Sequence, residues 1–136
     1  MTAADAPALV AALVEGHFAP FVAHVHGAFR VGERLLWGNV AASCAAAFRA
    51  VESSGVPREP VRERAGAFVA AAQPWFAGVG DFRVVEHAGR DGWYWDRGSC
   101  CLWFRTTNGG LCDNCSLIDA SELHERRIRE LAERAS

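Results

Sequence analysis

The stretch Cys100-Cys101-Leu102-Trp103-Phe104-Arg105-Thr106-Thr107-Asn108-Gly109-Gly110-Leu111-Cys112-Asp113-Asn114-Cys115 contains four of the five cysteines of the chain. Their spacing is CC-x10-C-x2-C, with a Gly-Gly pair shortly before the second half. Four thiols this close in sequence can meet at one point, which suits a tetrathiolate metal site better than scattered core cysteines. We therefore take this stretch as the functional centre of the protein.

The two cysteine pairs differ in what they can chelate. Cys112-x2-Cys115 is a local knuckle, whose two thiolates can bind the same metal. Cys100 and Cys101 are adjacent, and adjacent residues of an extended segment send their side chains to opposite sides, which makes joint chelation of one ion awkward. A binuclear cluster accommodates diverging thiolates more readily. The spacing therefore favours [2Fe–2S] over zinc and leaves both open.

Length and composition describe an ordinary globular protein. The 136 residues fit a single domain spanning 1–136 with one hydrophobic core. A hydrophobic fraction of 51% excludes a disordered chain, and a net charge of −2 gives no reason to expect nucleic acid as a partner. Asp5, Glu15 and His17 interrupt the apolar N-terminal stretch, so neither a signal peptide nor a membrane span is predicted. A cytoplasmic location is expected.

Hydrophobic periodicity predicts helices before the cysteine stretch and one after it. They cover residues 8–29, which Pro20 divides or kinks, residues 32–54, and a segment that starts near Pro60 and runs to about Phe76. The last helix begins at Asp119, which forms a capping box with Glu122.

The segment between these helices is β-prone. Residues 82–87 form a candidate strand, 89–92 a turn, and 93–95 and 101–104 further short extended segments. The predicted fold class is therefore α+β, predominantly α-helical. It is a helical bundle with a small antiparallel β element leading into a four-Cys metal loop.

Several side chains outside the cysteine stretch deserve separate interpretation. His17, His24 and His26 lie in the first helix, where His17 and His24 share a face, yet surface or partly buried histidines are favoured over ligands. Cys44 is interpreted as a small buried thiol rather than a redox-assisting one. Gly38 weakens the interior of the second helix, which indicates a close backbone approach.

Aromatic and basic residues surround the cysteines in sequence. Trp93, Trp95, Trp103 and Phe104 would shield a cluster and lower the local dielectric, or simply pack in the core. Arg97 and Arg105 could stabilise an anionic cluster or meet an anionic partner. Charge, solvent exposure and hydrogen bonds to sulfur set the potential of such a cluster.

Two segments of the chain, Arg97–Arg105 and Gly109–Leu117, resemble the C-terminal end of the FhuF-like siderophore ferric reductases. Leu36–Ala41, followed by an Ala-rich helix, is similar to the same family, so the resemblance covers roughly Leu35 to Leu117 in a chain that is shortened on its N-terminal side. That family carries a [2Fe–2S] cluster on the CC-x10-C-x2-C motif. The resemblance implies that the cluster ligands are Cys100, Cys101, Cys112 and Cys115.

The resemblance also implies an activity. The cluster takes one electron from a cellular reductant and passes it to Fe(III) held by a siderophore, often of the hydroxamate type. Ferrous iron binds those hard oxygen donors more weakly and can be released. The expected function is therefore an oxidoreductase, a [2Fe–2S] ferric-siderophore reductase whose partners are a ferric siderophore and an unknown electron donor. The alternatives are a non-enzymatic [2Fe–2S] electron carrier or module that works with a partner, and a structural zinc domain.

Overall fold

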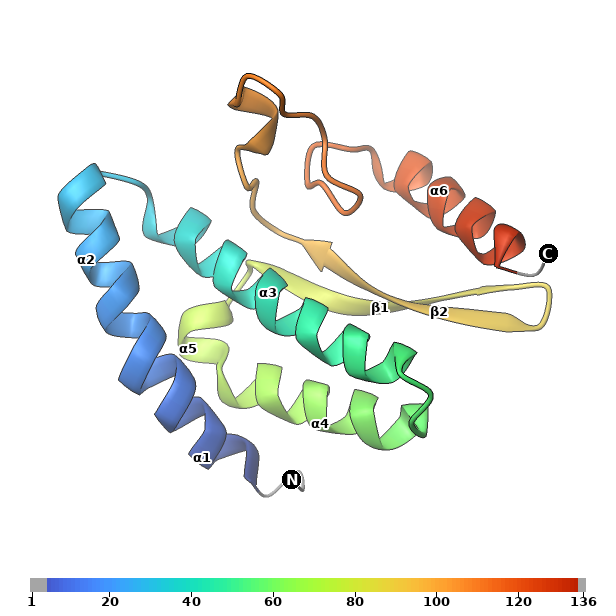
Figure 1. Ribbon diagram of the computed structural model, residues 1–136, viewed down its shortest axis with the longest axis horizontal. Coiled ribbons are helices and arrows are strands. Elements are labelled where there is room, and N and C mark those ends of the chain that lie inside the picture. Colours follow the sequence, from blue (N-terminus) through green and yellow to red (C-terminus); the bar gives the residue numbers. More distant parts are fainter. Residues whose placement is uncertain (1–4, 135–136) are drawn as a thin grey trace.

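The computed structural model describes residues 5–134. The helices are α1 (Ala6–Val10), the π-helix η2 (Ala11–Phe18), α2 (Ala19–Phe29), α3 (Glu33–Ser53), α4 (Arg58–Ala71), α5 (Gln73–Phe76), the 3₁₀ turn η3 (Trp103–Arg105) and α6 (Ala120–Glu133). Strands β1 (Gly80–His87) and β2 (Arg90–Arg97) form one antiparallel hairpin. The predicted class, α+β with helices dominating and a β element leading into the cysteine loop, is confirmed (Figure 1).

The first three helical segments run on from one another, so Pro20 does not break the predicted helix. The residues just before it are π-helical instead, and the N–H of Ala19 bonds to the carbonyl of Val14. A proline lacks the N–H donor and its ring collides with the carbonyl four residues earlier. A wider π turn ahead of the proline accommodates both effects and lets the chain continue as a helix.

The N-terminal helix is apolar over more of its surface than it buries. Residues Ala6–Phe29 are long and apolar enough to cross a membrane by length and composition, and few residues of its most apolar window are buried. Phe21 and Phe29, which continue its helical apolar pattern, are 57% and 72% exposed, while Val14 and Val22 are buried. The buried stripe is therefore narrower than the apolar pattern suggested.

The main core lies between the N-terminal helix, α3, α4 and α5, with Trp95 of β2 completing it. Helices α4 and α5 contribute a continuous buried face: Val61, Ala65, Phe68, Val69, Ala72 and Phe76. On α3 the most buried side chains are the small Ala41 and Ala45, whereas Val51 is 49% exposed. Alanines allow the neighbouring helices to approach closely, so they occupy the centre of the contact.

The hairpin lies between two helical layers. Alternate residues of a strand face opposite sides, so Trp93 and Trp95 of β2 pack toward α3 and α4, whereas Tyr94 packs with Leu131 of α6. Figure 1 shows β1 and β2 passing between α3 and α6. The turn is tighter than predicted, since Ala88 and Gly89 take positive φ values of 51° and 76° and Arg90 to Gly92 already belong to β2.

Helix α6 begins as predicted at the Asp119 cap, whose carboxylate accepts a hydrogen bond from the Ser121 amide at 2.8 Å. Arg127 attaches the helix to the hairpin. It is 5% exposed, pairs with Asp96 of β2, and its guanidinium lies 4.7 Å from the centroid of the Tyr94 ring. The cysteine loop is therefore held between two fixed ends, the end of β2 and the start of α6.

Candidate metal centre

The start of the cysteine loop rests directly on helix α3. Gly38 faces Ser99, and a Cβ atom at position 38 would lie 1.6 Å from the Ser99 Oγ. The close backbone approach predicted for Gly38 is confirmed, and the contacting residue stands immediately before Cys100. Only a residue without a side chain fits here, because Ser99 is itself buried.

Two arginines reinforce this junction by donating to uncharged oxygens. Arg34 of α3 donates to the carbonyl oxygens of Gly78 at 2.7 Å and Gly98 at 3.1 Å. Arg97 donates to the Asn39 Oδ1 at 2.7 Å and to the Ser99 carbonyl at 3.2 Å. Sequence reasoning noticed the Trp37-Gly38-Asn39 segment but missed Arg34, whose local pattern gives no signal of a partner this far along the chain.

After Cys101 the chain turns sharply, so the extended segment predicted for residues 101–104 is wrong. Leu102 is left-handed with φ 62°, and Trp103–Arg105 form the 3₁₀ turn η3. Gly109 then packs so closely that a Cβ there would lie 1.7 Å from the carbonyl oxygen of Trp103. This compact reversal carries Cys112 back beside Cys101.

The structure brings two of the four predicted ligands together. The Sγ atoms of Cys101 and Cys112 lie 3.8 Å apart and share a hydrogen bond. The Sγ of Cys100 instead accepts the backbone N–H of Leu102 at 3.3 Å, and that of Cys115 accepts the N–H of Leu117 at 3.5 Å. Cys115 is buried, at 3% exposure, while the other three are half-buried.

The pKa values of the Cys101 and Cys112 thiols are shifted in opposite directions. A hydrogen bond from the backbone N–H of Trp103 lowers the pKa of the Cys101 thiol below its usual value. Burial, followed by the hydrogen bond with Cys101, raises the pKa of Cys112 to about 11. Arg97 favours the thiolate of both. The Cys101 thiol therefore loses its proton more readily than the Cys112 thiol.

The donor set fits a binuclear centre better than a single four-thiolate ion. Across residues 5–134, no three His, Cys, Asp or Glu side chains are grouped so that they could hold one metal ion. The four thiols form one close pair and two sulfurs that each accept the backbone amide of the residue two positions later. Two metal atoms bridged by sulfide can use such a divided set, whereas one tetrahedral ion needs all four at one point.

The predicted aromatic shield divides into two groups. Trp93 and Trp95 lie in the core, where the ring centroids of Trp93 and Phe82 are stacked 4.0 Å apart. Trp95 also contacts the loop, since its carbonyl accepts the Asn114 side-chain amide at 3.2 Å. Trp103 and Phe104 are 47% and 42% exposed. Leu111 and Leu117 of the same loop are exposed as well, at 47% and 57%. We call the four exposed apolar side chains of the loop the apolar rim: Trp103, Phe104, Leu111 and Leu117.

The histidines and the fifth cysteine stay outside the site. His17, His24 and His26 are exposed on the N-terminal helix, and His26 Nδ1 lies 2.6 Å from the Val31 carbonyl oxygen. Cys44 of α3 packs against the main core, and burial raises the pKa of its thiol. The interpretation of the histidines as surface residues is confirmed, whereas Cys44 is half-buried against the core rather than fully buried.

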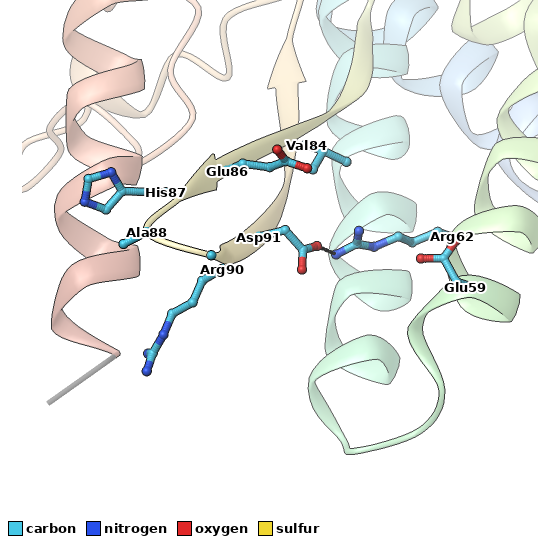
Figure 2. A pocket seen from close by; sticks show the side chains of 9 residues that line it. Glu59, Arg62, Val84, Glu86, His87, Ala88, Arg90 and Asp91 are labelled. Carbon is cyan, nitrogen blue, oxygen red and sulfur yellow. Dashed lines mark ion pairs between the residues drawn. The ribbon is translucent and has the colours of Figure 1, made fainter.

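A polar hollow of about 630 Å³ lies at the opposite end of β2, beside the hairpin turn (Figure 2). Asp91 and Arg62 point toward each other in it and form an ion pair at 2.5 Å, while His87 and Arg90 extend away from that pair. Its central charges are thus satisfied by the protein itself. The cysteine loop remains the better candidate for binding chemistry.

Comparison with known families gives two matches, one over the helical N-terminal part of the chain and one over the cysteine loop, and both are FhuF models. Residues 1–86 match the family model described as "Ferric iron reductase FhuF-like transporter", and residues 97–117 match "FhuF 2Fe-2S C-terminal domain". The first match extends the resemblance beyond Leu35 to the N-terminal helix. No curated protein and no solved structure matches the chain.

Proposed function

The chain belongs to the FhuF-like ferric iron reductase family, and on this premise we propose that it is a [2Fe–2S] ferric-siderophore reductase. Its substrate would be Fe(III) in a siderophore, of the hydroxamate type. The observation that carries the proposal is the cysteine loop itself. Four thiols are presented on a braced reversal whose 97–117 segment matches the family's 2Fe-2S domain.

Cys100, Cys101, Cys112 and Cys115 would hold the cluster, which when bound supplies a centre that takes up and gives up one electron. The protein's own contribution is to hold the sulfurs and tune them. The amides of Leu102 and Leu117 already donate toward Cys100 and Cys115. Arg97 favours negative charge on Cys101 and Cys112. Such groups raise the potential of a cluster by stabilising its added electron.

The apolar rim would position the substrate. A ferric tris-hydroxamate has no net charge, because three singly charged ligands balance Fe(III), so apolar surface suits it better than a strongly charged pocket. Trp103, Phe104, Leu111 and Leu117 all come from the loop that carries the cysteines. A chelate resting on this rim would lie near the cluster. The electron would come from a cytoplasmic reductant.

The same rim supports a second candidate, a non-enzymatic electron carrier. Weak electron-transfer interfaces are small, and exposed aromatic residues beside a redox centre could contact a protein partner as well as a chelate. In that case the iron-containing protein would exchange electrons with a partner protein but would not reduce free ferric chelates.

Anaerobically purified protein separates these functions. We expect a visible absorption spectrum and an EPR signal after reduction by dithionite. Reoxidation of the reduced protein by a ferric hydroxamate, with Fe(II) trapped by a ferrous chelator, is expected for the reductase. A coloured protein that does not reduce the chelate would favour the carrier. A colourless protein with one zinc per chain would contradict both.

A further inference from the structure

The loop brings together cysteines from different halves of the motif. Cys101 comes from the adjacent pair and Cys112 from the knuckle, and their Sγ atoms are 3.8 Å apart. Two thiolates on one tetrahedral metal, with metal–sulfur bonds of about 2.3 Å, would lie about 3.8 Å apart. This pair is therefore already spaced as two ligands of one metal atom.

Each sequence-local pair is divided. In Cys100-Cys101, the first sulfur accepts the amide of Leu102, while the second lies against Cys112. In Cys112-x2-Cys115, the second sulfur accepts the amide of Leu117 and is buried. The left-handed Leu102 and the 3₁₀ turn behind it produce this arrangement, because they fold the second half of the motif back onto Cys101.

We infer that Cys101 and Cys112 bind one iron of the proposed centre, and that Cys100 and Cys115 bind the other. The inference rests on the proposed [2Fe–2S] function and adds how its four thiolates are shared between the irons. It departs from the local arrangement, in which the knuckle holds one iron and the adjacent pair the other. Cys100 and Cys115 are also alike in their surroundings, since each accepts the amide of the residue two positions later.

Double serine variants distinguish the three ways of dividing four ligands into two pairs. ⁵⁷Fe Mössbauer spectra of the oxidised protein report each iron, and an iron that keeps two cysteines should keep the wild-type doublet. We expect one wild-type doublet and one altered doublet for Cys101→Ser/Cys112→Ser. The matched variants Cys112→Ser/Cys115→Ser and Cys101→Ser/Cys115→Ser should show no wild-type doublet, because each removes one cysteine from both irons.

A wild-type doublet in either matched variant, and none in Cys101→Ser/Cys112→Ser, would overturn the pairing while leaving the cluster in place. The absence of iron and colour from the wild-type protein would instead overturn the proposed function. These two failures are thus separate, because the first is read from variants and the second from the wild-type chain.

A second measurement covers the case in which the double variants assemble no cluster. One equivalent of phenylarsenic(III), which bonds to two neighbouring thiols, is added to the chelator-stripped full chain. Free thiols are then alkylated, the arsenic is removed with a competing dithiol, and the released pair takes a heavy alkylating reagent. Trypsin cleavage after Arg97, Arg105 and Arg126 separates the two halves of the motif into peptides 98–105 and 106–126.

We expect the heavy label on Cys101 and Cys112, one in each peptide, and the light label on Cys100, Cys115 and the distant Cys44. A heavy label on both Cys112 and Cys115, or on both Cys100 and Cys101, would contradict the inference. Fragmentation between Cys100 and Cys101 assigns the label within the first peptide.

Discussion

The hairpin turn and the base of the cysteine loop, at opposite ends of strand β2, are held in place by different kinds of contact. At the turn, Asp91 pairs with Arg58 at 2.9 Å and Arg62 at 2.5 Å, and Arg62 also pairs with Glu52 at 2.6 Å. Near the loop, Asp96 still pairs with Arg83 and Arg127. The two arginines at the base of the loop itself, Arg34 and Arg97, donate to uncharged oxygens, and neither forms an ion pair within residues 5–134.

This difference lies in what the arginines bind. At the turn, Arg58 and Arg62 pair with the carboxylate of Asp91. At the base of the loop, Arg34 and Arg97 hydrogen-bond to backbone carbonyls and to Asn39. The thiols of the loop form hydrogen bonds only with each other or with backbone amides, among the bonds described for residues 5–134. Thiols presented in this way are available to a metal, and backbone bracing keeps them in place before it binds.

The largest effect is expected from removing one ligand at the loop end. Cys112→Ser should lose nearly all iron and visible absorption, because serine is a poor replacement for a thiolate ligand of iron. Iron content and the visible spectrum of the anaerobically purified variant measure the effect. An unchanged spectrum would count against the ligand assignment.

Gly38, at which α3 contacts the residue before Cys100, should be the next most sensitive position. Gly38→Ala should destabilise the fold by about 1–3 kcal/mol, because the new methyl group overlaps Ser99. Iron occupancy should fall with it, since Ser99 precedes Cys100. Urea unfolding and iron content together report both effects.

A control variant and a compensating double variant test whether the effect of Gly38→Ala comes from its overlap with Ser99. Gly66→Ala in α4 is the matched control, because no atom lies within 4 Å of the added Cβ, and it should stabilise the helix by about 0.5–1 kcal/mol. Ser99→Gly added to Gly38→Ala should restore iron occupancy. If Gly38→Ala alone binds iron normally, the α3 contact does not support the site.

The turn end should respond in stability and pH dependence but not in iron content. Asp91→Asn should cost about 1 kcal/mol at pH 7. The hydrogen bond from Arg62 lowers the pKa of Asp91, so its contribution is present above its unfolded pKa of about 3.9 and is lost as pH falls through the folded value. Urea unfolding between pH 7 and 3 should therefore show a smaller acid-induced loss in the variant. An altered iron spectrum would contradict the separation of the two ends.

The smallest effect is expected at Cys44, which lies at neither end of β2. Cys44→Ala should leave the visible and EPR spectra unchanged, because this thiol packs against the main core rather than the loop. It should lower stability by about 1 kcal/mol or less through lost packing. Loss of the cluster in this variant would mean that the fifth thiol takes part in assembly.

Local patterns predicted much of the secondary structure because they depend on neighbours in sequence. The span of α3, the hairpin strand at 82–87 and the Asp119 cap follow from periodicity, β-propensity and capping chemistry, and all were found. The buried face of the N-terminal helix could not be obtained this way. Phe21 and Val22 are both apolar, and only the position of α3 decides that Val22 is buried and Phe21 exposed.

The sequence by itself determined the set of four cysteines and their division into an adjacent pair and a knuckle, since spacing is a property of the chain alone. Only the tertiary structure decided that Cys101 lies against Cys112, and that the loop stands on Gly38. The Cys101–Cys112 contact depends on the reversal that follows the left-handed Leu102, and the Gly38–Ser99 contact depends on the packing of β2 against α3. Both contacts join residues that are separated in sequence, and spacing alone does not encode them.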